Sequence, residues 1–249
     1  GSGSGPSVRH DGPMPTLDAV AHDLREQWDL LRAWLEQLPD TASEQPSTLP
    51  GWSLGVLVAH LGRVLSSTSA MTLDETDERP LSIDDLLAGY GSHDPGRVDA
   101  NARAYAAEIA DDPLAHLDVL ADTAFAHVDL LAEQATDTTA IRTRHGDRIG
   151  LVDYLLTRVV ELVVHAYDLA PALGAPAPVD PTARTLVSDV LLEVLHERTG
   201  YQLDVVDQEA WIKAAAGRLT WPAAVERGAV RPAAASDGTP DLTRSLPLL

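Results

Sequence analysis

The sequence predicts a mainly α-helical protein, with a helical bundle over residues 15–174 and a small α/β or α domain over residues 175–249. Apolar residues recur at intervals of three and four along several stretches that are long enough for bundle helices. A segment with four prolines, 171–181, separates the two parts. With 249 residues, 45% of them hydrophobic, the chain can bury a core in each. Residues 1–14 begin with a Gly-Ser repeat typical of an expression tag and are excluded from the fold prediction.

The first two bundle helices have clear start and stop signals. The first is predicted to begin after Thr16, as N-cap, and to continue to Leu38, where Pro39 ends it. A polar loop follows, and Ser53 is the expected N-cap of a second helix that continues to about Leu65.

The middle of the chain supplies the other bundle helices. Residues 74–96 are acidic and rich in turn formers, so we expect a long connection that shapes substrate specificity and contains a short helix at 83–88. Helices are predicted at 98–109 and 114–131, and the most apolar helix of the chain at 151–169. In the C-terminal part we expect a helix at 182–196, a strand at 201–206 and two short helices on either side of Gly217.

Composition excludes several classes of function. Lys and Arg total 18 against 38 Asp and Glu, and the resulting net charge of −20 repels nucleic acids and anionic membrane surfaces. The chain has no cysteine, so any thiol chemistry needs an external thiol. No stretch approaches roughly 18 consecutive apolar residues, and no signal-peptide core is present. We therefore expect a cytoplasmic protein that acts on neither membranes nor nucleic acids.

Five polar side chains of the 151–169 helix fall on one stripe. Tyr154, Arg158, Glu161, His165 and Asp168 are spaced by four, three, four and three residues. Such a stripe is usually the solvent face of an amphipathic helix. Here nearly all other directions are apolar, which favours a helix surrounded by neighbours and a stripe that faces an internal cleft. A buried carboxylate at position 161 would need a cation to offset its desolvation.

Glu161 and His165, four residues apart, can converge on one metal ion. His60 is a candidate third ligand, although a single helical histidine is more often a core or surface residue, so periodicity alone leaves its role open. His93 and His145 lie in predicted loops and receive no role. Four other helical histidines have an acidic residue within a turn and are interpreted as surface residues: His22, His116, His127 and His196.

Two motifs carry a resemblance to a known family. Residues 49–53 read LPGWS and lead to VAHLG at 58–62, and residues 158–170 read RVVELVVHAYDLA. Together they resemble the mycothiol-dependent maleylpyruvate isomerase family of actinobacteria. The resemblance implies a DinB-like four-helix bundle and a divalent metal, usually zinc. The ligands that it implies are His60, Glu161 and His165.

The tail is similar to the small sterol-carrier-protein-like domain that is often fused to this bundle. The residues that carry this similarity are Trp211, Ala216 to Leu219, Trp221, Gly228 and Leu246 to Leu249. The stretch between His196 and Trp211 is short for a full sheet, so we expect a truncated domain without a lipid tunnel. The resemblance implies that Arg218 contacts acidic substrates.

A site with three protein ligands keeps a position open for a thiol. The resemblance implies mycothiol as cosubstrate and, as its target, a small electrophile, for which we consider a carboxylate-bearing molecule. Isomerisation and S-conjugation both remain open outcomes, and no catalytic residue is predicted beyond the metal site. Asp168 is expected to support a metal ligand. Candidate residues for binding the substrate or the thiol are Arg63, Arg158, Arg218, Tyr154 and Tyr167.

Two other functions fit part of the pattern. Two histidines and a carboxylate with open positions also describe a non-haem iron oxygenase. A non-catalytic protein that binds a small molecule or lipid is the alternative from another class, but such a carrier has no need for an intact metal-binding triad. The oligomeric state is not predicted.

Overall fold

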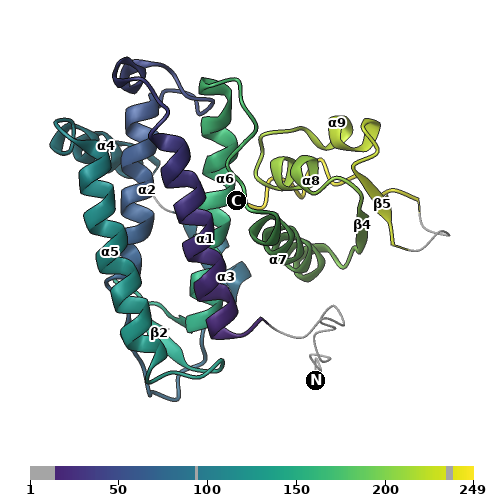
Figure 1. Cartoon of the computed structure of the whole chain (residues 1–249). Helices are drawn as coiled ribbons and strands as arrows, with labels where there is room; N and C mark the ends of the chain where they lie inside the picture. Colours follow the sequence, from purple (N-terminus) through teal and green to yellow (C-terminus); the bar gives the residue numbers. More distant parts are fainter. Residues whose placement is uncertain (1–14, 93–94, 234–237) are drawn as a thin grey trace. The chain divides into compact units, whose positions relative to one another are not determined.

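A computed structural model describes residues 15–92, 95–233 and 238–249 (Figure 1). The described residues divide into two compact units, 16–187 and 188–249. The boundary that the sequence predicts, between residues 174 and 175, lies earlier in the chain and stays a prediction. No helix in the described ranges has the length and apolarity needed to cross a membrane.

Four helices form the bundle of the first unit: α1 (Leu17–Leu35), α2 (Leu54–Thr68), α5 (Pro113–Ala132) and α6 (Leu151–Leu169). Helices α1 and α2 each contact both α5 and α6, so the four close into a ring (Figure 1). Every residue of α6 is buried except Asp153 and Glu161, as expected for a helix that is apolar on nearly all sides. The mainly α-helical, DinB-like fold predicted from the sequence is confirmed.

Local signals explain where the bundle helices begin. The hydroxyl of Thr16 accepts a hydrogen bond from the backbone N–H of Ala19, and Ser53 caps α2 in the same way. Helix α5 begins at Pro113, because proline lacks the N–H that the first turn of a helix leaves unpaired. These caps fix the starting points of the two helices that the sequence marked most clearly.

The connections between the bundle helices contain two further helices and a small sheet. Helices α3 (Ile83–Ser92) and α4 (Pro95–Glu108) lie between α2 and α5, and α4 packs on α2. The short helix predicted at 83–88 is therefore longer, and the one predicted at 98–109 begins earlier. A small antiparallel sheet has the order β1 (Thr72–Leu73), β2 (Ala140–Arg142), β3 (Arg148–Gly150). Its strands have only two or three residues, too few for a periodic sequence signal.

The second unit continues from α7 (Pro181–Thr199), a helix whose first residues belong to the bundle unit. The remaining elements are β4 (Leu203–Val205), α8 (Gln208–Ala215), α9 (Trp221–Glu226) and β5 (Val230–Pro232). Strands β4 and β5 pair antiparallel, and Trp211 is fully buried, with its indole N–H donating to the carbonyl of Ser188. The predicted strand contains β4, and the two short helices lie on either side of Gly217. Strand β5 was not predicted.

A close approach between α2 and α5 depends on Gly62. A Cβ atom placed there would lie 2.8 Å from a methyl group of Leu117, which is itself fully buried. We expect Gly62→Val to lower the free energy of unfolding by about 2 kcal/mol, because the added atoms overpack this contact. Gly89→Ala is the matched control, since a Cβ at this helical position meets no atom within 4 Å. Denaturant unfolding of the two variants checks this, and equal stability of both would contradict it.

Candidate metal centre

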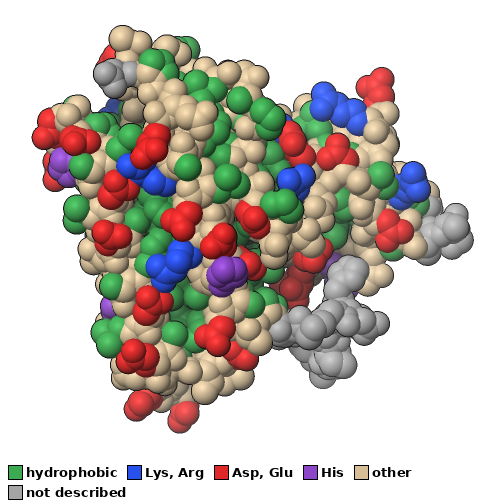
Figure 2. Space-filling model, viewed as in Figure 1, with side chains coloured by type: hydrophobic (Ala, Val, Ile, Leu, Met, Phe, Trp, Pro, Cys, Tyr) green, Lys and Arg blue, Asp and Glu red, His purple; other side chains and the backbone are tan. Residues whose placement is uncertain are grey.

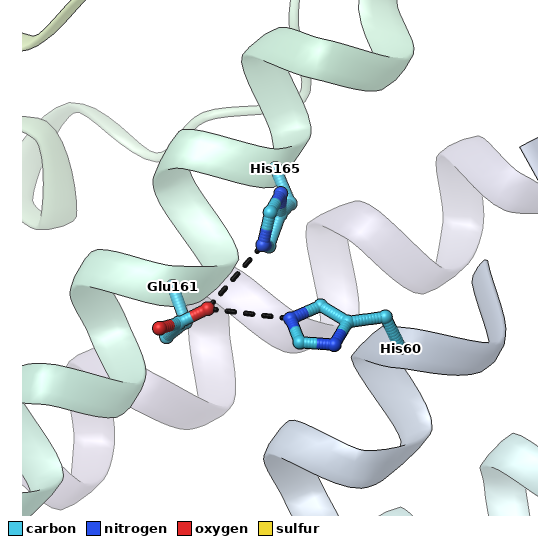
Figure 3. Close-up of side chains that lie close together, drawn as sticks. All are labelled: His60, Glu161 and His165. Carbon is cyan, nitrogen blue, oxygen red and sulfur yellow. Dashed lines mark ion pairs between the residues drawn. The ribbon is translucent and has the colours of Figure 1, made fainter. Parts of the chain in front are cut away.

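Two bundle helices bring three potential ligands together. Glu161 and His165 lie one turn apart on α6, and His60 faces them from the middle of α2 (Figure 3). The Nε2 atoms of His60 and His165 lie 3.5 and 3.3 Å from Oε2 of Glu161. One potential ligand atom from each residue lies within 4.8 Å of the others. Within the described residues, this is the cluster of histidine and acidic side chains with metal-binding spacing.

The electrostatics of this cluster favour a cation at its centre. Burial raises the pKa of the Glu161 carboxyl, but its hydrogen bonds with His165 and His60 outweigh this effect and hold the pKa well below its usual range. Burial lowers the pKa of His165, but hydrogen bonds to Asp168 and Glu161 raise it to about 9. The pKa of His60 is lowered, chiefly by burial. A protonated His165 thus supplies the positive charge in the metal-free cluster, and a divalent ion would replace its proton.

Asp168 lies behind His165 on the same helix. The Nδ1–H of His165 donates to Oδ2 of Asp168 at 3.0 Å, and the other carboxylate oxygen accepts from the hydroxyl of Thr48 at 3.2 Å. The Asp168 side chain is almost fully buried, at 1% exposure. This bond fixes the ring orientation of His165 and leaves its Nε2 directed at Glu161. Such a carboxylate behind a histidine is a common support for a metal ligand.

The loop before α2 supports His60. The ring of Trp52 meets the imidazole edge to face, with centroids 5.3 Å apart. The Trp52 side chain also hydrogen-bonds Asp99 of α4, and Asp99 is held by Arg103 at 2.9 to 3.0 Å. Arg103 in turn donates to the carbonyl of Gly51. The sequence motif drew attention to this loop without indicating its contact with His60.

The cluster opens on a cavity of about 590 Å³ within the bundle unit. His60 and Glu161 line it, whereas His165 does not. The other candidates on α2 and α6 that line it are Arg63, Tyr154 and Arg158. Other lining residues come from α3, from α4 and from the turn between β2 and β3, which contributes His145. A small molecule in this cavity would therefore have access to two of the potential ligands, His60 and Glu161.

Arg158 is the most buried cation of the cavity, at 7% exposure. Its guanidinium donates to the hydroxyls of Ser67 and Thr157 at 3.2 Å and lies 4.9 Å from the centre of the Tyr154 ring. The Tyr154 hydroxyl donates to the carbonyl of Ser67 at 3.4 Å. Arg63 is half-buried on α2. These side chains are positioned from the two helices that also hold the cluster.

The remaining candidates lie elsewhere. Tyr167 is buried and does not line the cavity. Arg218 is an exposed residue of the second unit whose guanidinium donates to the carbonyl of Ala216, and its role in substrate binding stays a prediction. His93 lies outside the described residues. Two histidines interpreted as surface residues are half-buried instead, His127 because it bonds to the Met71 carbonyl at 2.8 Å, and His196.

Fold and site together define a class of protein: a DinB-like helical bundle with two histidines and one glutamate gathered beside a cavity. Residues 24–170, more than half of the chain, match the family model "Mycothiol maleylpyruvate isomerase N-terminal domain", and the chain belongs to this family. The resemblance drawn from the two motifs is thereby confirmed, and it places the chain in a family of enzymes.

A solved structure described as a mycothiol-dependent maleylpyruvate isomerase has a similar fold, with a TM-score of 0.51. The match covers 84% of this chain and 91% of that one, and at 17% sequence identity it supports the fold alone. A search of curated proteins found no match.

The bond between His165 and Asp168 predicts a measurable effect on metal affinity. We expect Asp168→Asn to weaken zinc binding about 10- to 100-fold, because the ring loses its charged acceptor. Competition with a chromophoric chelator measures the affinity. Asp153→Asn, in the first turn of the same helix and half-buried, is the control and should bind zinc like the wild type. Equal affinities in all three proteins would show that Asp168 does not support a ligand.

Proposed function

We propose that this protein is a metal-dependent enzyme that uses mycothiol to attack an electrophilic small molecule, with His60, Glu161 and His165 as the metal ligands. The observation that carries the proposal is the approach of these three side chains to within 4.8 Å beside a cavity. Family membership supports the same chemistry.

The ligand atoms suit zinc. Two imidazole nitrogens and one carboxylate oxygen are a common catalytic set, which leaves at least one position for an external molecule. A divalent metal lowers the pKa of a bound thiol, so that the nucleophilic thiolate exists near neutral pH. Because the chain has no cysteine, this thiol must come from outside.

The protein's own residues orient the reactants. Asp168 holds His165, Trp52 holds His60, and both ligands keep their nitrogens directed at Glu161. Arg158 and Arg63 offer guanidinium groups to a substrate carboxylate, which a planar fork binds bidentately. The cavity is of the size range that binds small molecules. We propose a carboxylate-bearing electrophile on this basis.

The reaction begins when the thiolate adds to a carbon–carbon double bond that is conjugated to a carbonyl group. A carbon–sulfur bond forms, and the electron pair of the double bond moves onto the carbonyl oxygen as an enolate. Rotation followed by expulsion of the thiolate restores the double bond in the trans form, which is isomerisation. Protonation of the enolate instead leaves an S-conjugate. Both outcomes use the same site.

We expect the wild type to contain one zinc ion per chain and to consume an enone acid only when mycothiol is present. His60→Ala and Glu161→Ala should each lose the metal and reduce thiol-dependent turnover by at least about a hundredfold, because a ligand is missing. Metal analysis and a substrate absorbance assay measure both quantities. His22→Ala, an exposed histidine on α1, is the control and should keep both.

Two results would contradict this proposal. If wild type and Glu161→Ala hold metal equally, the ligand assignment is wrong. If the bound metal is iron and turnover requires oxygen instead of thiol, the site belongs to an oxygenase.

A further inference from the structure

The charges that line the cavity differ from those of the chain as a whole. Acidic residues outnumber Lys and Arg by 38 to 18, and acidic side chains are spread over the face shown in Figure 2. The cavity is lined by as many arginines as acidic residues: Arg63, Arg144 and Arg158 against Asp85, Asp147 and Glu161. Two of these acids are already engaged, Glu161 with the histidines and Asp85 with the backbone N–H of Ser82. The share of positively charged side chains is therefore higher in the cavity lining than in the chain as a whole.

Several arginines of the bundle unit are paired with carboxylates. Arg32 pairs with Asp118 at 2.6 Å and Arg25 with Asp129 at 2.9 Å. Among the residues that the structure describes, neither Arg63 nor Arg144 forms an ion pair. In so acidic a chain, two cations that face one cavity without such a partner are suited to an anion that arrives from solution.

Arg144 is exposed and also lines the cavity, so it lies at the mouth. Its turn is fixed by ion pairs on both flanking strands. Arg142 and Arg148 lie 2.6 and 3.5 Å from Oδ2 of Asp74, whose side chain is only 4% exposed. Arg142 also donates to the carbonyl of Gly146 within the turn, at 3.0 Å. Because the turn is already fixed, only the side chain of Arg144 has to be ordered when an anion binds.

We propose that Arg144 is a specificity residue, which binds an anionic group of the electrophile at the mouth of the cavity. This inference rests on the proposed function, because it assigns one more contact to the same cavity. Arg158 and Arg63 lie on the helices that carry the metal ligands, whereas Arg144 comes from the turn between β2 and β3. An acid is thereby selected over a neutral analogue of the same shape, since only the acid gains this charged hydrogen bond.

Calorimetric titration with succinate, an unreactive dianion, tests the inference without any turnover. We expect Arg144→Gln to weaken succinate binding about tenfold, in both metal-free and zinc-loaded protein, because one charged hydrogen bond is lost. Arg144→Lys should fall between Arg144→Gln and wild type, since it keeps the charge but not the fork. Arg79→Gln is the matched control: it removes the same charge from an exposed arginine that does not line the cavity.

A second measurement compares turnover of an enone acid with turnover of its methyl ester. The wild type should prefer the acid in kcat/KM, and in Arg144→Gln this preference should fall about tenfold while the zinc is kept, because Arg63 and Arg158 still line the cavity. Equal succinate affinity in wild type and Arg144→Gln, or no succinate binding by the wild type, would overturn the inference. Absence of thiol-dependent turnover would instead overturn the proposed function, while the titration would still decide the role of Arg144.

Discussion

The carboxylate of Glu161 must be paired with positive charge or hydrogen-bond donors, and the arrangement of the helices around it meets this requirement. It projects from a helix that is buried on nearly every side, and its own side chain is only 23% exposed, so most of it is removed from water. Removing such a charge from water costs several kcal/mol unless cations or hydrogen-bond donors face it. His165 and His60 face it at 3.3 and 3.5 Å, and their hydrogen bonds keep it ionised despite its burial. The pairing of His60 with Glu161 therefore stabilises the position of α2 against α6, in addition to apolar packing.

The surrounding structure holds the two histidines at this carboxylate. Asp168 and Thr48 fix His165 from behind, while Trp52 contacts His60 from the loop that caps α2. The close packing at Gly62 keeps the backbone of α2 near α5. Asp168, Thr48 and Trp52 thus hold the two histidines in place, and the side of the cluster that faces the cavity stays open to reactants. This division suits a site in which the protein supplies orientation and the external thiol supplies the nucleophile.

The sequence predicted the elements that have long periodic patterns. The bundle helices and the pairing of Glu161 with His165 follow from spacing, because positions four apart share a helical face. Proximity of His60 did not follow from spacing: contact between two helices depends on tertiary packing, and only the resemblance suggested it. A loop around His145 was predicted, but the sequence did not indicate that it brings Arg144 to the cavity, because its flanking strands are too short for a periodic signal. The support from Trp52 and Thr48 also comes from loops, which carry no periodic signal.

X-ray absorption at the zinc edge, before and after one equivalent of mycothiol, tests most directly whether this cluster holds a metal with a position for a thiol. We expect zinc to have nitrogen and oxygen neighbours at roughly 2.0–2.2 Å, and one new sulfur neighbour at about 2.3 Å once the thiol is added. Because the chain has no cysteine, a thiolate sulfur at this distance can come only from mycothiol. Unchanged nitrogen and oxygen neighbours after addition of the thiol would show that the metal has no position for mycothiol.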